Sequence, residues 1–198
     1  MARIKDEQLH EQRRLQILKA ASQVFKAKGF HAARTEDICV AAVLSAGTVF
    51  RYFASKDEII LTIAEMEIAE YRDKLAELAT KEGLRWMAQL NAKDLAQVLA
   101  PSQFNLGLDS WVELCRNPKY HKRIIEQDCE LRATLTVALR KGQRAGWVRT
   151  SLNVSGAANV ILALFSGLMF DSQANPKIDL KATAIAVADF FSCCVLKN

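Results

Sequence analysis

The 198-residue sequence is poor in residues that interrupt regular structure, with three prolines and eight glycines. It also shows hardly any sustained alternation of apolar and polar residues, which is the pattern of a half-buried strand. Apolar residues make up 51% of the chain, enough to bury a core, and they recur at helical spacing instead. The sequence therefore predicts an all-α protein with one small and one larger domain.

Motifs that usually carry catalysis are missing as well. We find no glycine-rich phosphate loop, no nucleophile with an adjacent base and no metal-ligand spacing, so a helical enzyme is a distant alternative and we expect no cofactor. The cysteines include no C-x-x-C pair, and we interpret them as small buried hydrophobic residues in a reducing compartment. An adjacent pair leaves a redox or metal site as a further alternative. The five are Cys39, Cys115, Cys129, Cys193 and Cys194.

Long hydrophobic runs and a signal-peptide pattern are also lacking. The most apolar run, residues 160–170, is shorter than the roughly 20 residues that a bilayer requires, and Ser166 and Gly167 interrupt it. We therefore expect a cytoplasmic protein with no membrane partner. The net charge of +5 permits binding to nucleic acid without establishing it, because the placement of the charges decides.

Two short helices joined by a tight turn, and the start of a third, are predicted for residues 35–58, TEDICVAAVLSAGTVFRYFASKDE. Thr35 precedes an apolar series, so we expect its hydroxyl to cap the first helix. Ser45 is placed to cap the second helix, and Ser55 with Glu58 forms an S-x-x-E capping box for the third. On the residues alone, a helical hairpin with solvated polar side chains is the alternative.

The second of these helices has one apolar side and one small, polar side. Val49 and Phe53 are four residues apart and are expected to face the core. Gly47 permits close approach of the backbone to a phosphate or a base edge. Lys56 gains nothing from the dipole at the start of the third helix, so we assign its charge to an anion outside the protein.

Together these positions resemble the signature of the TetR family of bacterial transcriptional repressors. In that family a Thr opens the second helix, Ser-x-Gly-Thr follows in the next, and an aromatic pair precedes Ser-Lys-Asp/Glu. The resemblance implies a helix-turn-helix that binds double-stranded operator DNA. The residues expected to contact DNA are Thr35, Ser45, Ala46, Gly47, Thr48, Arg51, Tyr52 and Lys56.

Two positions depart from the family pattern. Val43 stands where the family usually has Gly, and a β-branched residue is poorly suited to a positive φ, which predicts a different turn here. Phe50 stands where Tyr is frequent, so one hydroxyl that could reach a phosphate is missing, at a cost of about 1 kcal/mol. Arg51 is expected to compensate by adding charge or by reading a guanine.

Helix signals continue through the rest of the chain. Ile17, Leu18, Ala21, Val24 and Phe25 predict an amphipathic first helix that ends at Gly29. Further helices are predicted for residues 56–80, 84–99, 102–116, 118–145, 153–171 and 178–195, which brings the total to nine, the number that the resemblance implies. We expect residues 1–55 to form the DNA-binding domain and residues 56–198 to form an effector-binding and dimerisation domain.

The last two predicted helices, near residues 153–171 and 178–195, are rich in small and apolar residues over much of their surface. Such helices are buried on two sides, one facing the core and the other a partner. The resemblance implies that they pair with their copies in a homodimer, which suits a palindromic operator. A purely intramolecular core is the alternative.

Between these regions, large apolar residues with polar neighbours indicate a small-molecule pocket, although an ordinary core has the same composition. The residues expected to contact an unknown effector are Trp86, Phe104, Leu108, Asp109, Trp111 and Cys115. The function that follows is a ligand-responsive repressor that the effector releases from its operator. The alternative is an architectural or cell-division DNA-binding protein on the same scaffold without an effector.

Overall fold

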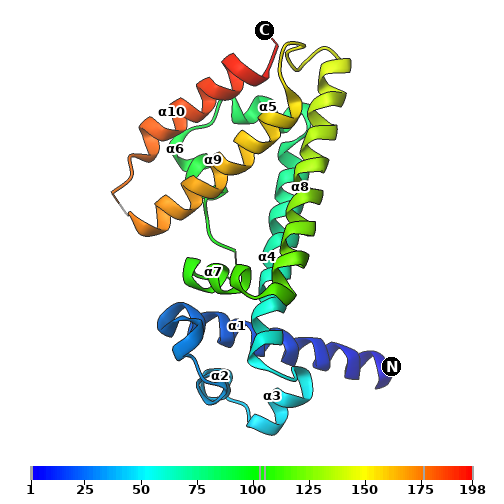
Figure 1. Ribbon diagram of the computed structural model, residues 1–198, viewed down its shortest axis with the longest axis vertical. Coiled ribbons are helices and arrows are strands. Elements are labelled where there is room, and N and C mark those ends of the chain that lie inside the picture. Colours follow the sequence, from blue (N-terminus) through cyan, green and yellow to red (C-terminus); the bar gives the residue numbers. More distant parts are fainter. Residues whose placement is uncertain (1, 103, 105, 176, 198) are drawn as a thin grey trace. The chain divides into compact units, whose positions relative to one another are not determined.

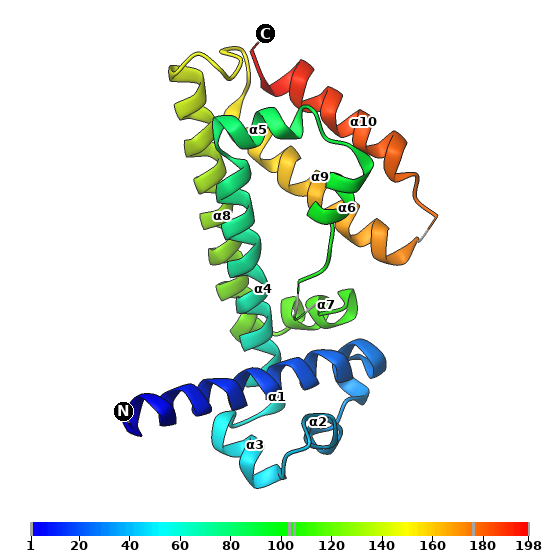
Figure 2. The ribbon, with the colours of Figure 1, turned by 180° about the vertical axis from the view of Figure 1, so that it is seen from behind.

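The computed structural model describes residues 2–102, 104, 106–175 and 177–197, and the side chains of residues 2–6, 108 and 119 also lie outside the description. Ten α-helices and a final π-helical turn make up this part of the chain (Figures 1 and 2). The prediction of an all-α fold is confirmed. The helices are α1 (Ala2–Ala32), α2 (Thr35–Ala42), α3 (Ala46–Tyr52), α4 (Lys56–Leu78), α5 (Lys81–Met87), α6 (Ala92–Val98), α7 (Leu108–Arg116), α8 (Pro118–Arg144), α9 (Val154–Ala174) and α10 (Leu180–Phe190), followed by the π-helical turn η1 (Phe191–Val195).

The described chain has one helix more than the nine predicted. The single helix predicted for residues 84–99 is divided into α5 and α6, because each half has its own N-terminal cap. Thr80 caps α5, and the Asn91 side chain accepts a hydrogen bond from the Asp94 backbone N–H to start α6. The helix predicted for residues 102–116 begins only at α7.

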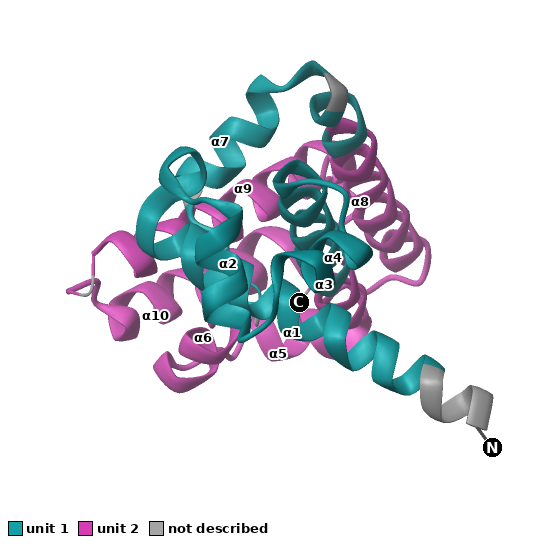
Figure 3. Cartoon of the chain, turned by 90° about the horizontal axis from the view of Figure 1, so that it is seen from below, with its two compact units in different colours: residues 1–70, 102–124 teal, residues 71–101, 125–198 magenta. Residues whose placement is uncertain are grey.

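The chain divides into two compact units, shown in Figure 3. Unit 1 comprises residues 1–70 and 102–124, and unit 2 comprises residues 71–101 and 125–198. Helix α4 therefore begins in unit 1 and ends in unit 2. The functional boundary between residues 55 and 56 stays a prediction.

The core of unit 1 is built around α1. Ile17, Leu18, Ala21 and Phe25 are buried, as their helical spacing predicts. The predicted end at Gly29 marks a kink with a φ of 73°, after which α1 continues to Ala32. Buried side chains from α2, α3, α4 and the segment around α7 complete this core: Ile38, Val49, Phe53, Ile59, Ile60, Ile63, Phe104 and Leu114.

The core of unit 2 contains the C-terminal part of α4 together with α8, α9 and α10. Figures 1 and 2 both show α9 and α10 side by side. Phe165 of α9 contacts Phe191 at the start of η1, directly after α10, and their ring centroids lie 6.4 Å apart. Leu75 of α4 and Leu135 of α8 are buried in the same core.

Helix α9 is, among the described residues, the one helix long and apolar enough to cross a membrane by length and composition. The apolar run of residues 160–170 considered from the sequence is only the central part of this helix. One face of α9, which carries Ala158, Ile161 and Phe165, is buried in the core of unit 2. A third of the most apolar 18-residue stretch of the helix is buried. This face packs as a core helix packs, whereas the opposite face is exposed.

The predicted burial of the cysteines is wrong for four of the five. Cys39 is buried in unit 1, but Cys115, Cys129, Cys193 and Cys194 are exposed. They lie on the outward faces of α7 and α8 and in η1, so hydrophobic packing does not account for them. Among the described residues, no group of three or more His, Cys, Asp or Glu side chains is placed to hold a metal ion.

Candidate nucleic-acid interface

Helix α2 begins at Thr35, so the predicted cap is wrong by one residue. Arg34 precedes the helix, and its backbone N–H donates to the Asp37 side chain at 3.0 Å. Asp37 also accepts from Lys28 Nζ at 2.7 Å. The Lys28 hydrogen bond, followed by the Arg34 backbone N–H, lowers the pKa of Asp37. Asp37 therefore satisfies the start of α2 that Thr35 was predicted to cap.

The turn after α2 keeps left-handed geometry despite its valine. Val43 has φ 54° and ψ 44°, and it is the only described residue other than glycine with a positive φ. Its N–H donates to the Val40 carbonyl at 3.1 Å, and the Leu44 N–H donates to the Cys39 carbonyl at 3.0 Å. This pair of bonds is a Schellman motif, in which glycine normally occupies the left-handed position. The prediction of a different turn is therefore wrong, and Val43 carries the strain.

Ser45 caps α3 as predicted. Its Oγ accepts a hydrogen bond from the Thr48 backbone N–H at 3.2 Å and lies 2.9 Å from Thr48 Oγ1. Val49 and Phe53 are both buried in unit 1, which confirms that they face the core. Because the apolar side of the helix is held there, its opposite side faces solvent.

The exposed side of α3 consists of Ala46, Gly47, Phe50 and Arg51. Arg51 lies beside Tyr52, with the guanidinium carbon 5.4 Å from the ring centroid. The half-buried Tyr52 ring also packs against the ring of His10 in α1, with the centroids 4.6 Å apart and the planes tilted by 39°. The sequence did not predict this role for His10, since 42 residues separate the two rings. Arg51 and Tyr52 are thus held together at the edge of the exposed face.

The start of α4 follows the predicted capping pattern with one difference. The Glu58 backbone N–H donates to Ser55 Oγ at 3.1 Å. The Glu58 carboxylate accepts from the Ala54 N–H at 2.6 Å, one residue before the expected partner. These two hydrogen bonds therefore fix the loop between α3 and α4 as well as the N-terminal end of α4.

Lys56 has partners inside unit 1 that the sequence did not reveal. Its ammonium donates to the carbonyls of Phe30 at 2.7 Å and Ala33 at 2.9 Å, and it lies 4.2 Å from the Phe30 ring centroid. These carbonyls belong to the end of α1, where unpaired acceptors favour a cation. The assignment of the Lys56 charge to an external anion alone is therefore corrected, since two of its three N–H donors serve the fold.

Helix α1 braces the helix-turn-helix from the other side. Gln16 Nε2 donates to the Ala42 carbonyl at 2.7 Å, which satisfies an acceptor at the end of α2. The Arg14 guanidinium lies 5.7 Å from the Phe53 ring centroid. Figures 1 and 2 both show α1 lying along α2 and α3. Helices α1 and α2 therefore hold α3 in place within unit 1.

Comparison with known proteins identifies the family to which this helix-turn-helix belongs. Residues 17–63 match the family described as bacterial regulatory proteins, tetR family, and residues 92–191 match the BetI-type transcriptional repressor, C-terminal. The chain belongs to the TetR family. It is a DNA-binding transcriptional regulator of a non-enzymatic family, and its helix-turn-helix is formed by α2 and α3.

Curated relatives within the TetR family are distant but span most of the chain. The regulator UidR of Escherichia coli K12 is 25% identical over 166 residues, which cover 81% of this chain and 82% of UidR. The repressor Rv1474c of Mycobacterium tuberculosis is 29% identical over 153 residues, covering 75% of each chain. Both are HTH-type transcriptional regulators by name.

Solved structures share the fold at about a fifth sequence identity. A regulator from Saccharomonospora viridis in complex with choline has a TM-score of 0.73 at 22% identity, covering 95% of this chain and 100% of its own. FadR of Bacillus subtilis in complex with stearoyl-CoA has a TM-score of 0.69 at 22% identity, covering 90% and 97%. These structures show that proteins of this fold bind small molecules.

In this TetR-family chain, the segment leading into α7 is fastened to unit 1. Ser22 Oγ donates to the Phe104 carbonyl at 2.6 Å. Glu67 of α4 accepts from the Leu106 backbone N–H and from Trp111 Nε1, the latter at 3.0 Å. Burial raises the pKa of Glu67 to about 7, although both hydrogen bonds act in the opposite direction. Glu67 is thus a partly buried carboxylate that joins α4 to the α7 segment.

The predicted effector residues are spread over two units. Trp86 is exposed on α5 in unit 2, and the side chain of Leu108 lies outside the described residues. In unit 1, Phe104 is buried in the core and Trp111 is half-buried against Glu67. Asp109 and Cys115 are exposed on α7. Their role in effector binding stays a prediction.

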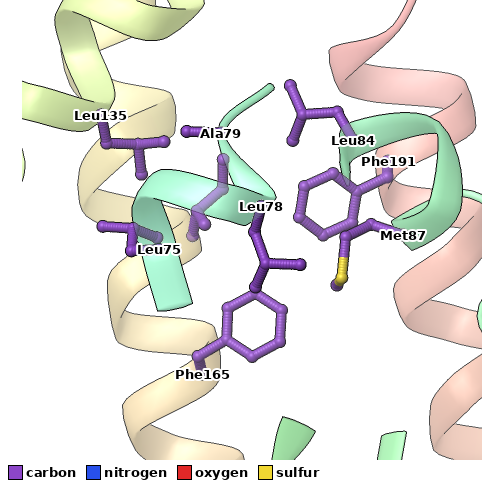
Figure 4. A pocket seen from close by; sticks show the side chains of 9 residues that line it. Leu75, Leu78, Ala79, Leu84, Met87, Leu135, Phe165 and Phe191 are labelled. Atoms are coloured by element: carbon purple, nitrogen blue, oxygen red, sulfur yellow. The ribbon is translucent and has the colours of Figure 1, made fainter. Parts of the chain in front are cut away.

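The structure shows a cavity elsewhere, in unit 2. The space that a water-sized sphere can reach in it is about 10 Å³, room for about one water molecule, and Figure 4 shows apolar side chains around it. Of the five predicted effector residues with described side chains, none lines this cavity. The lining residues are Leu75, Leu78, Ala79, Leu84, Met87, Leu135, Ile161, Phe165 and Phe191.

Proposed function

We propose that the protein is a homodimeric repressor that binds a palindromic operator and is released by a small-molecule effector. The observation that carries this proposal is the pair of exposed, small and apolar faces on α9 and α10. The chain also has a helix-turn-helix that α1 braces, and it belongs to a family of DNA-binding regulators. Dimerisation and DNA recognition therefore have separate surfaces, as a symmetric operator requires.

The exposed face of α9 follows a helical stripe opposite the buried face. Val160, Ala163, Gly167 and Phe170 recur at intervals of three and four residues and are all exposed. Such a stripe has small residues that allow close approach of a second helix and large residues that provide apolar area. A monomer would leave this area in water.

Helix α10 has a matching stripe. Ala182, Ile185, Ala186 and Asp189 are exposed, and Ile185 retains 56% of its surface. Because α9 and α10 lie side by side within unit 2, their stripes support one self-complementary interface. We infer that the two helices of one protomer pair with the same two helices of its partner.

A symmetric pair presents two copies of α3 to DNA. Recognition helices about 34 to 36 Å apart meet successive major grooves, which accounts for a palindromic site. In our proposal Arg51 and Tyr52 contact the duplex, together with Thr35, Ser45 and the start of α3. Lys56 contacts the duplex through its third N–H donor, because the carbonyls of Phe30 and Ala33 accept only the other two.

In our proposal the cavity of unit 2 widens to take an apolar group of the effector, since in this structure it has room for about one water molecule. All nine lining side chains are apolar, which favours a lipophilic group over a charged one. The relatives in complex with choline and with stearoyl-CoA support regulation by a small molecule. The BetI-type match over residues 92–191 favours this function over an architectural DNA-binding role.

Helix α4 offers a direct route from the cavity to the helix-turn-helix. Leu75 and Leu78 line the cavity near its C-terminal end, and its N-terminal end follows α3. An effector that prefers a different position of α4 would lower DNA affinity by its differential binding energy, typically about 1 to 3 kcal/mol. The protein acts in the cytoplasm, where the operator lies.

The test begins with duplex fragments that the purified protein retains from its source genome. We expect R51A to weaken binding to a retained fragment by at least tenfold in a gel shift. R140A, which removes an equal charge from an exposed position on α8, should change affinity less than twofold. Equal losses for both variants would mean that net charge alone, and not α3, carries binding.

A further outcome separates the two candidate functions. A repressor retains a few fragments that share a palindrome, and an added effector releases them. An architectural protein retains many fragments without a shared sequence. Binding should also weaken steeply with salt, because neutralised phosphates release counterions.

A further inference from the structure

Phe50 occupies the middle of the exposed side of α3. It keeps 51% of its surface exposed, although it is a large apolar residue. At 100° per residue, its position lies about 40° from that of Ala46 and about 60° from that of Gly47 on the helix circumference. Val49, the next residue back along the chain, is fully buried and provides the core contact of this turn.

The residues around Phe50 offer no side-chain hydrogen bonds. The side chain of Ala46 has neither a donor nor an acceptor, and Gly47 has no side chain. A Cβ added at Gly47 would meet no atom within 4 Å. Arg51 stands at the edge of this face beside Tyr52. The centre of the face is thus an open apolar surface with one protruding ring.

DNA has one apolar group that such a ring can recognise. In the major groove each base pair presents hydrogen-bond donors and acceptors, and only thymine adds a methyl group at C5. Apolar side chains, Phe among them, contact this methyl. A phenyl ring without a hydroxyl has no donor for a phosphate, so the base edge is the partner that suits it.

We propose that Phe50 is a specificity-determining residue that recognises the C5-methyl group of a thymine in each half of the operator. This inference rests on the proposed function, because it requires α3 to enter the major groove. The operator must then contain a thymine at one fixed position in each half-site, opposite the middle of α3.

Replacing thymine by uracil tests this inference, because uracil lacks only the methyl group. The operator is first selected by the full-length protein from a random duplex pool, and each thymine is then replaced singly and in symmetric pairs. We expect one position per half-site to respond. The loss should be roughly fourfold per half-site, which corresponds to about 0.8 kcal/mol for one buried CH₂ group, and roughly fifteenfold for the symmetric pair.

The F50A variant provides the second arm. Phe50 is exposed, so F50A should keep the helical content of the wild-type protein. It should bind the thymine and uracil duplexes equally, and both more weakly than the wild type binds the thymine duplex. V137A removes a side chain of similar exposure, 63%, from α8 and should leave the thymine preference intact.

The outcomes separate this inference from the function on which it rests. If the wild type binds a selected operator but tolerates uracil at every position, Phe50 does not recognise thymine, whereas the proposed function survives. A thymine preference that persists in F50A would overturn the inference in the same way. If no duplex is enriched from the pool, both the proposed function and the role of Phe50 are wrong.

Discussion

The strained turn at Val43 leads to a stability prediction whose sign is unusual for a glycine substitution. The left-handed conformation costs a residue with a Cβ roughly 1–2 kcal/mol, and a β-branched residue is at the upper end. V43G removes this cost. It should therefore stabilise the protein, although glycine normally destabilises a folded chain.

The size of the effect follows from what Val43 contributes to the turn. Its side chain is 85% exposed, so little buried surface is lost on its removal. Its N–H bond to the Val40 carbonyl is a backbone bond that glycine retains. Glycine adds unfolded-state entropy worth about 0.5–1 kcal/mol, which leaves a net gain of about 1 kcal/mol. In a chain of this length, that gain raises Tm by about 2–4 °C.

The matched control is V40G, three residues earlier on α2. Val40 is also exposed, at 78%, but it lies in the helix itself. Glycine inside a helix costs roughly 0.5–1 kcal/mol, so V40G should lower Tm while V43G raises it. Circular dichroism melts at one fixed protein concentration measure both. A V43G protein that melts with or below the wild type would refute the argument from backbone strain.

Three further predictions concern other parts of the molecule. The pKa of Glu67 is raised to about 7 from 4.5, so the native state holds a proton that the unfolded state has lost, and the free energy of unfolding falls as pH rises between these values, by on the order of 1 kcal/mol per pH unit. E67Q should flatten this fall in urea titrations, and an unchanged pH profile would remove Glu67 as its cause. I185D should shift the protein to monomer in analytical ultracentrifugation while V137D does not; a dimeric I185D protein would exclude α10 from the interface. S45A should lower the free energy of unfolding by about 1 kcal/mol, because the Thr48 N–H loses its cap, and no measurable change would show that this bond adds nothing in water.

The helix-turn-helix was predictable because its signals are local. The caps formed by Ser45 and Ser55 involve residues three positions away, and both predicted bonds are present. The error at Thr35 is of the same local kind, because Asp37 satisfies the Arg34 N–H one residue earlier. Boundaries of this type shift by a residue whenever two neighbouring polar groups compete for a helix end.

The contacts that the sequence did not reveal join distant segments. Lys56 reaches carbonyls 23 and 26 residues away, and Glu67 reaches Trp111 over 44 residues. No helical spacing records such pairs, because they depend on how α1, α4 and α7 pack. The cavity of unit 2 was missed for the same reason, since its lining combines residues from α4, α5, α8, α9 and η1.

The central claim is that two copies of α3, one from each protomer, enter successive major grooves of an operator. Footprinting of a selected operator with the full-length protein tests this directly. We predict two protected stretches related by two-fold symmetry, with centres about 10 base pairs or a multiple of that spacing apart, and we predict that both disappear together in R51A. A single asymmetric footprint, or a symmetric one that R51A leaves unchanged, would contradict the account.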